Sequence, residues 1–307
     1  MMLQLPQRIR VLSDGRPGHE NQSVGLAAAI ARRTGATVEV VRLPVKGGLW
    51  RRGRTALGEA PAVPDLLIGA GHKVHLPMWF AARRFRARSV VIMLPTWPVG
   101  LFDLCLTPDH DLRPGKVYSR IIGTRGALNR LPEALPPKES RGVVLLGGPC
   151  RHHGWDGPAV VAAIREVLAA RLELTWTIAD SRRTPPGFLE GLRREQTPAT
   201  LTSYTETSAE WLPQQLMTAQ EVWVTRDSVS MVFEAITAGA RTGLLPTPVL
   251  RRKDGPVRSI EGLVRDGFAV EFASWQRDDR RLPEPRRLHE TARCAALVLK
   301  RLFNDRD

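Results

Sequence analysis

Short apolar runs alternate along the chain with longer stretches in which apolar residues recur every three or four positions. The short runs end at glycine, proline or polar turns, as buried strands do, and the longer stretches have the period of amphipathic helices. Strands are predicted at residues 9–12, 37–41, 65–70, 89–94, 102–107, 143–146, 172–178, 200–203, 222–225 and 242–245. Helices are predicted from about residue 21, after the turn at 180–186, and at residues 76–84, 157–171, 211–218, 229–238 and 286–303, whereas residues 46–58 are expected to form a loop.

The alternation is interrupted once, where prolines cluster. Pro132, Pro136 and Pro137 lie in a stretch without periodicity, which is typical of an interdomain linker. A chain of 307 residues is long enough for two medium domains. Because strands alternate with helices, the pattern predicts an α/β fold with two Rossmann-like, parallel-sheet domains facing a cleft. The first domain is expected over residues 1–135 and the second over residues 141–284.

Composition places the chain among globular proteins of a reducing compartment. Hydrophobic residues make up 43% and charged residues 25%, which are ordinary values for that class. No apolar run approaches the ~20 residues of a membrane span, and the first residues lack the apolar core of a signal peptide. Cys105, Cys150 and Cys294 are few and widely spaced, which argues against a disulfide framework or a zinc site. A cytoplasmic protein is therefore expected.

The net charge of +14 comes mainly from arginine pairs scattered through the chain. Such a surface favours an anionic ligand or an anionic membrane. Nucleic acid is disfavoured, because aromatic residues make up only 6% and do not interleave with the basic residues, as a base-stacking surface requires. The charge adds a second expected location, peripheral at the inner membrane.

The first candidate site follows the strand at 9–12. Gly15 and Gly18 allow close approach of the backbone to a ligand, but they do not complete the dinucleotide fingerprint, so no nicotinamide cofactor is expected. His19 is either a structural residue or a catalytic one at the carboxyl end of this strand. The polar and glycine residues expected to line this acceptor-side site are Ser13, Asp14, Gly15, Gly18, Glu20, Asn21 and Gln22.

The second candidate site lies at residues 221–239, a strand, a polar turn and a helix that Gly239 ends. Asp227 and Ser228 are good N-cap types, and the same helix terminus attracts phosphate. Ser230 and Glu234 are four residues apart and share a helix face, so one could lie near a diphosphate and the other near a ribose diol. The alternative is an ordinary capped helix with a solvated glutamate.

Two further motifs were weighed for ligand chemistry. The turn at Gly147 and Gly148 is either merely tight or a place where backbone amides meet phosphate. Asp109, His110 and Asp111 contain metal-ligand types, but adjacent side chains point in different directions and no second cluster completes a site. No metal and no cofactor are therefore expected.

The chain resembles the elongated-mitochondria (mitochondrial fission) family over nearly its whole length, as a bacterial member. The matching stretches are residues 13–22, 65–71, 102–111, 124–129, 147–149, 181–185, 225–235 and 289–291. The sequence departs from the family pattern at Leu94–Pro98 and at Phe233, where a small residue is usual.

More distantly, the layout is similar to the two-domain glycosyltransferases of the B type (GT-B). That resemblance implies a nucleoside-diphosphate-sugar donor with its ribose at Glu234, its diphosphate near Ser228 and Ser230, and a general base at His19. It also implies that residues 285–307 form a helix that packs back on the first domain. The residues expected to bind the nucleotide sugar are Gly147, Gly148, Arg182, Arg226, Asp227, Ser228, Ser230, Met231 and Glu234.

The resulting hypothesis is a metal-independent glycosyltransferase. Its expected partners are the nucleotide sugar and either an anionic membrane surface or a lipid-linked acceptor. Two alternatives stay open. One is a nucleotide-sugar epimerase of the same fold, and the other is a non-catalytic adaptor at a membrane surface.

Overall fold

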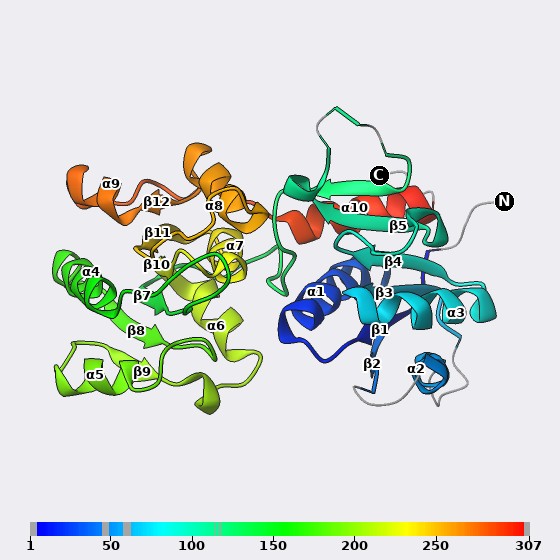
Figure 1. The fold of residues 1–307 in the computed structure, drawn as a ribbon, viewed down its shortest axis with the longest axis horizontal. Helices are drawn as coiled ribbons and strands as arrows, with labels where there is room; N and C mark the ends of the chain where they lie inside the picture. The colour runs from blue at the N-terminus through cyan, green and yellow to red at the C-terminus, as the bar shows by residue number, and fades with distance from the viewer. Residues whose placement is uncertain (1–4, 45–48, 58–62, 114, 117, 304–307) are drawn as a thin grey trace. The chain divides into compact units, whose positions relative to one another are not determined.

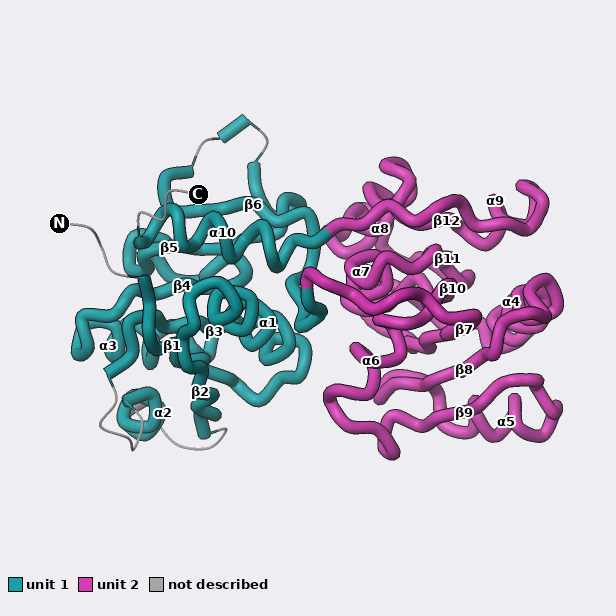
Figure 2. The backbone as a smooth tube through the Cα atoms, turned by 180° about the vertical axis from the view of Figure 1, so that it is seen from behind, with its two compact units in different colours: residues 1–132, 289–307 teal, residues 133–288 magenta. Residues whose placement is uncertain are grey.

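The computed structural model describes residues 5–44, 49–57, 63–113, 115–116 and 118–303. The chain divides into two compact units (Figure 2). Unit 1 contains residues 1–132 together with residues 289–307, and unit 2 contains residues 133–288. Each unit is an α/β sandwich around one parallel sheet, so the predicted fold class is confirmed (Figure 1).

Unit 1 has a six-stranded parallel sheet in the order β2-β1-β3-β4-β5-β6. Its strands are β1 (Arg8–Ser13), β2 (Thr37–Arg42), β3 (Leu66–Ala70), β4 (Arg88–Ile92), β5 (Leu104–Pro108) and β6 (Ile121–Thr124). Its helices are α1 (Pro17–Thr34), α2 (Leu49–Ala56), α3 (His75–Phe85) and α10 (Glu290–Phe303), with 3-10 turns η1 (His72–Val74), η2 (Val99–Leu101) and η3 (Asp109–Asp111).

The last helix of the chain completes the core of the first unit. On one face of the sheet, Leu26 and Ile30 of α1 pack in the same buried cluster as Val298 and Leu299 of α10. The start of α10 is fixed by Thr291, whose hydroxyl accepts from the Asn129 amide at 3.0 Å and donates to the Asn129 carbonyl at 3.1 Å. The expectation that the final helix returns to the first domain is therefore confirmed.

Unit 2 has a second six-stranded parallel sheet in the order β12-β11-β10-β7-β8-β9. Its strands are β7 (Glu139–Leu145), β8 (Thr175–Ala179), β9 (Thr200–Thr202), β10 (Ala219–Thr225), β11 (Arg241–Leu245) and β12 (Val270–Glu271). Its helices are α4 (Gly157–Ala170), α5 (Phe188–Arg194), α6 (Trp211–Thr218), α7 (Val229–Thr237), α8 (Gly255–Arg265) and α9 (Phe272–Arg277), with the 3-10 turn η4 (Tyr204–Glu206).

Three sequence predictions about unit 1 are wrong. The expected loop at 46–58 contains α2, whose Ala56 is fully buried, whereas residues 46–48 and 58 lie outside the described part. α1 begins at Pro17, about four residues early, because proline lacks an N–H and has the φ of a first helical residue. Residues 121–124, where no strand was predicted, form the edge strand β6 beside β5.

In unit 2, α8, β12 and α9 were not predicted from the sequence. In unit 1, the final helix α10 begins at Glu290, not at the predicted residue 286. No helix in the described part of the chain is both long and apolar enough to cross a membrane.

Candidate functional site

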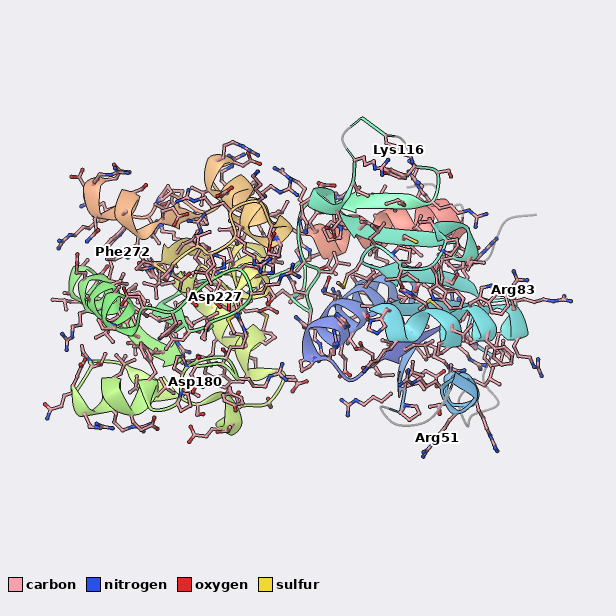
Figure 3. All side chains as sticks on the ribbon, in the orientation of Figure 1. Arg51, Arg83, Lys116, Asp180, Asp227 and Phe272 are labelled. Atoms are coloured by element: carbon pink, nitrogen blue, oxygen red, sulfur yellow. The ribbon has the colours of Figure 1, made fainter. Side chains whose placement is uncertain are left out.

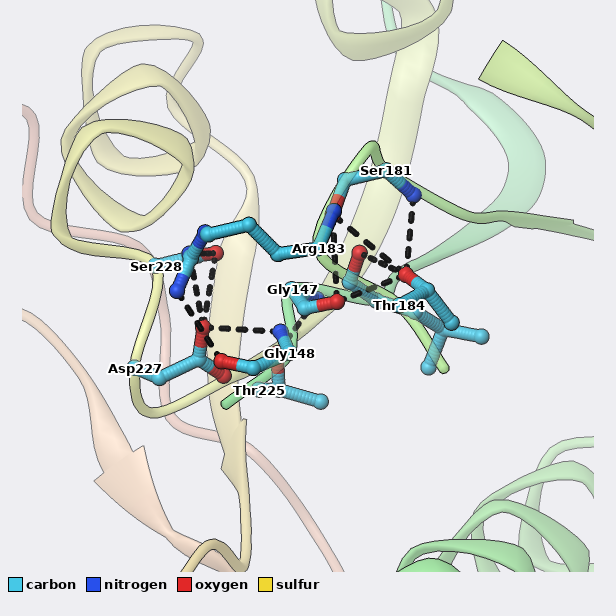
Figure 4. Close-up of polar contacts among 9 residues, drawn as sticks. Gly147, Gly148, Ser181, Arg183, Thr184, Thr225, Asp227 and Ser228 are labelled. Carbon is cyan, nitrogen blue, oxygen red and sulfur yellow. Dashed lines mark hydrogen bonds and ion pairs between the residues drawn. The ribbon is translucent and has the colours of Figure 1, made fainter. Parts of the chain in front are cut away.

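A polar cluster in unit 2 forms where β7, β8 and β10 end (Figure 4). Asp227 follows β10, and its side chain is completely buried. Its Oδ2 accepts a hydrogen bond from the Gly148 amide at 3.0 Å and pairs with the Arg183 guanidinium at 2.7 Å. The Ser228 hydroxyl accepts from the same guanidinium at 2.8 Å. Three neighbouring strand ends therefore meet around one buried carboxylate.

Gly147 and Gly148 make this approach sterically feasible. A Cβ on Gly147 would lie 2.1 Å from Asp227 Oδ2, and a Cβ on Gly148 would lie 1.8 Å from the Arg183 carbonyl oxygen. The Gly147 amide donates to the Thr225 hydroxyl at 2.7 Å. The two amides expected to meet a phosphate thus have partners within the protein, and the glycines serve close packing of the turns.

Arg183 is the arginine that contacts this cluster, whereas Arg182 was the one predicted from the sequence. The turn after β8 is held by hydroxyls, because Ser181 and Thr184 both donate to the Gly147 carbonyl, at 3.1 and 2.6 Å. That geometry directs Arg183 to Asp227 and Ser228 at the start of α7, although its side chain remains 40% exposed. The predicted Arg182 is exposed as well. The pair of arginines in this turn was visible in the sequence, but the direction of each side chain was not.

The N-terminus of α7 carries no side-chain cap. Ser228 is the N-cap residue, but its hydroxyl is bonded to Arg183 and not to a helix amide. The capping bonds predicted for Asp227 and Ser228 are therefore wrong, because Arg183 engages both side chains. The first amides of an α-helix have no intrahelical partner, so this terminus presents N–H groups beside a guanidinium. Such an arrangement attracts an anion.

The other predicted donor-side residues occupy different surroundings. Ser230 is exposed on the first turn of α7, and Glu234 is buried one turn later, with 9% of its surface exposed. Met231 is half-buried. Arg226 turns to Glu271 at 3.1 Å and Glu261 at 3.7 Å, so its guanidinium is engaged away from Asp227.

A second polar cluster lies in unit 1, where β1 runs into α1. Asp14 has a completely buried side chain that accepts from the Arg16 amide at 3.1 Å and contacts His19 Nδ1 at 3.0 Å. A carboxylate only accepts hydrogen bonds, so Nδ1 carries the proton, and in the neutral ring Nε2 retains its lone pair. The His19 side chain is 16% exposed. This pair has the geometry of an oriented base.

The turn after β3 packs against the same imidazole. Gly71 has φ +86°, and a Cβ there would lie 2.5 Å from the His19 ring. β3 is the neighbour of β1 in the sheet, so two adjacent strand ends hold His19 between them.

Ser13 and Glu20 form a hydrogen-bonded network at the end of β1, beside Asp14 and His19. The Ser13 hydroxyl donates to Glu20 at 2.6 Å, and Glu20 pairs with Arg42 at 3.1 Å and lies 3.8 Å from Arg130. The hydrogen bond from Arg42 is the main reason that the pKa of Glu20 lies below its usual value. Gly15 is exposed in the turn, and Gly18, Asn21 and Gln22 lie in the first turns of α1.

Within the described ranges, no group of three or more histidine, cysteine, aspartate or glutamate side chains is arranged to hold a metal ion.

Comparison with known proteins gives the chain a family. The sequence model described as Mitochondrial fission ELM1 matches residues 17–302. The chain belongs to this family. The resemblance found in the sequence motifs is therefore confirmed. The unit 2 cluster and His19 lie within the matched residues, whereas Ser13 and Asp14 precede them. None of the curated proteins compared with the chain matches it.

Solved structures share the fold at low identity. A candidate UDP-N-acetylglucosamine 2-epimerase from Listeria monocytogenes is 14% identical with a TM-score of 0.61, covering 98% of each chain. S. aureus MnaA, solved with UDP, is 12% identical with a TM-score of 0.53, covering 97% of each chain. The UDP-GlcNAc 2-epimerase from Neisseria meningitidis, solved bound to UDP-GlcNAc, is 12% identical with a TM-score of 0.51, covering 97% of this chain and all of that one. This ELM1-family chain therefore has the GT-B-like architecture.

Proposed function

We propose that this ELM1-family chain is a metal-independent glycosyltransferase that binds a nucleoside-diphosphate sugar in unit 2. The observation that carries the proposal is the uncapped N-terminus of α7 beside the Arg183 guanidinium. Fixed amide dipoles and an arginine can stabilise the charge that develops on a leaving diphosphate without a cation. The UDP and UDP-GlcNAc found in two proteins of the same fold support this ligand class.

The donor contacts follow from the geometry of α7. The diphosphate is assigned to the helix amides, with Ser228, Ser230 and Arg183 around it. Glu234, one turn further along, is assigned to the ribose diol, because a carboxylate accepts two hydrogen bonds from adjacent hydroxyls. Met231 lies between these two positions on the helix.

Acceptor activation is assigned to unit 1. In the proposed reaction, His19 Nε2 removes the proton of an acceptor hydroxyl, and the acceptor oxygen forms a bond to the anomeric carbon of the sugar. The bond from that carbon to the diphosphate oxygen breaks, and the electron pair leaves with the diphosphate. Asp14 acts as a positioning residue, because its hydrogen bond at Nδ1 keeps the lone pair on Nε2.

The proposal is tested first by binding. A thermal-shift screen of nucleoside diphosphates and their sugars should identify a ligand, and calorimetry should then compare wild type with Glu234→Ala. Loss of two hydrogen bonds to a charged group should cost about 1–3 kcal/mol of binding free energy. Equal affinities would contradict the ribose assignment. If a donor binds and its sugar is inverted in configuration without any acceptor, the protein is the epimerase instead.

A second candidate function, attachment to an anionic membrane surface, is favoured by one face of unit 1. Residues 43–102 contain nine lysines and arginines but two acidic residues. Figure 3 shows Arg51 and Arg83 projecting outward from α2 and α3. Phe80, one turn before Arg83 and Arg84, is 43% exposed, and both arginines are exposed. Basic side chains beside an exposed ring match an anionic lipid surface.

Vesicle flotation tests this face. Binding should increase with phosphatidylglycerol content and weaken with salt, and Arg83→Glu with Arg84→Glu should reduce it. The matched control is Arg193→Glu with Arg194→Glu, a basic pair at the end of α5 in unit 2. Equal losses for both variants would mean that net charge alone, not the face of unit 1, attaches the protein. Vesicle binding without any nucleotide ligand would favour the adaptor.

A further inference from the structure

His153 lies over the carboxyl end of β10. The strand order places β10 between β7 and β11. The loop after β7 nevertheless joins the loop after β11, because His153 forms a bridge with Val249 and the Gly154 amide donates to the Pro248 carbonyl at 2.8 Å. The loop must therefore cross the end of β10, which continues into Arg226 and Asp227.

This crossing buries polar atoms without partners. His153 is 1% exposed, and in the described part of the protein neither of its ring nitrogens has a hydrogen-bond partner. Asp227 Oδ1 is also buried and has no hydrogen-bond partner in the described residues, whereas Oδ2 contacts the Gly148 amide and Arg183. A buried polar group without a hydrogen-bond partner destabilises the fold, so the occurrence of these groups in one region requires a reason.

The charges around His153 come from three elements. Asp227 and Arg226 approach from the turn after β10, Arg183 from the turn after β8, and His152 from the loop of His153 itself. Burial is the main cause that lowers the pKa of His153, and the charge of Asp227 opposes it. At neutral pH the ring is therefore neutral while Arg183 neutralises Asp227.

We infer that His153 takes up a proton when Arg183 turns from Asp227 to the diphosphate of a bound nucleotide sugar. The inference rests on the proposed function of this site. Arg183 exchanges its contacts to Asp227 and Ser228 for phosphate oxygens. Asp227 would then be a buried anion without its cation, and a solvent proton on His153 restores the charge balance beside Oδ1. His153 acts here as a positioning residue, since it acts through the charge of Asp227 and is not assigned to the sugar.

Proton uptake by His153 fixes the direction in which nucleotide-sugar affinity depends on pH. Binding that takes up a proton is tighter at lower pH, within the window between the His153 pKa of the free protein and the higher one of the complex. The free value lies below that of an ordinary histidine because of burial. Affinity for the nucleotide sugar should therefore increase as the pH falls through this window and level off below it.

The first test needs no ligand. In protein labelled at the histidine ring, NMR titration should follow His153 in wild type and in Arg183→Gln, which removes the cation from Asp227 permanently. The apparent pKa of His153 should rise by about one pH unit or more, as expected for an opposite charge that is no longer compensated. The matched control, Arg182→Gln, removes a neighbouring exposed arginine and should leave the titration unchanged. An equal pKa in wild type and Arg183→Gln overturns the inference.

The second test separates the inference from the proposed function. Calorimetry with UDP-N-acetylglucosamine, in buffers of different ionisation enthalpy, should report proton uptake by wild type and none by His153→Gln. Binding without proton uptake overturns the inference and leaves the donor assignment standing. If this sugar nucleotide does not bind, while Arg183→Gln still raises the His153 pKa, the proposed function loses its donor and the coupling between Arg183 and His153 remains.

Discussion

Gly148→Ala should destabilise unit 2, because the turns after β7 and β8 are in contact at this glycine. The added Cβ would lie 1.8 Å from the Arg183 carbonyl oxygen and 2.8 Å from the Thr184 amide nitrogen. Both are backbone atoms, so a side-chain rotation cannot relieve the clash, and one of the turns must move.

The displacement can be given a magnitude from the bonds that it breaks. The turn contacts at risk are the Gly148 amide to Asp227 at 3.0 Å, Arg183 to the Gly148 carbonyl at 2.9 Å, and Thr184 to the Gly147 carbonyl at 2.6 Å. At about 1 kcal/mol for a neutral bond, and more for those with a charged partner, losing two or three costs roughly 2–4 kcal/mol.

Urea denaturation followed by tryptophan fluorescence measures the effect. The matched control is Gly191→Ala in α5, where a Cβ meets nothing within 4 Å. Alanine is the better helix former, so this variant should be more stable than wild type by about 0.5–1 kcal/mol. The reasoning is refuted if Gly148→Ala unfolds at the same urea concentration as wild type.

Three further predictions concern unit 1. Gly71→Ala places a Cβ 2.5 Å from the His19 ring. The rate of sugar transfer should therefore fall by about 10²-fold or more in a turnover assay, while donor affinity stays unchanged. The control is Gly100→Ala, whose Cβ meets nothing within 4 Å. Asp14→Asn should lower turnover within the ~10²–10⁴-fold range of a positioned base, and unchanged turnover would remove Asp14 from its positioning role. Glu20→Gln should lower the free energy of unfolding at pH 7, because Arg42 holds the pKa of Glu20 below its usual value. That difference should disappear in denaturation curves recorded as the pH falls below the ordinary glutamate value of about 4.3, and a difference that persists in acid would contradict the ion-pair explanation.

The sheets were predictable because buried parallel strands are continuous apolar runs. Residues 143–146 and 222–225 have this pattern, and both lie in or beside the central strands of unit 2. α2 was not predictable, since it has only eight residues, three arginines make it polar overall, and Gly53 disfavours a helix interior. It packs against α3, and such contacts stabilise a short helix.

The location of the unit 2 site could be predicted from the sequence, but the side-chain contacts within it could not. The motif around Asp227 and Ser228 marked the α7 terminus, because strand, polar turn and helix follow one another in the sequence. The choice between Arg182 and Arg183 depends on two hydroxyls that bind the Gly147 carbonyl in the folded protein. His153 gave no signal, since its burial arises only when its loop crosses a strand that is more than sixty residues away.

The return of α10 sets an order of events during synthesis. Unit 2 is one continuous segment, residues 133–288, so it can fold as soon as that segment has left the ribosome. Most of unit 1 is synthesised first, but its core cannot be completed until later. Val298 and Leu299 of α10 belong to the same core as α1. Until α10 has been synthesised, the apolar side chains of α1 that pack against it are exposed to water and can be bound by chaperones. Truncation before α10 should therefore destabilise unit 1 more than unit 2.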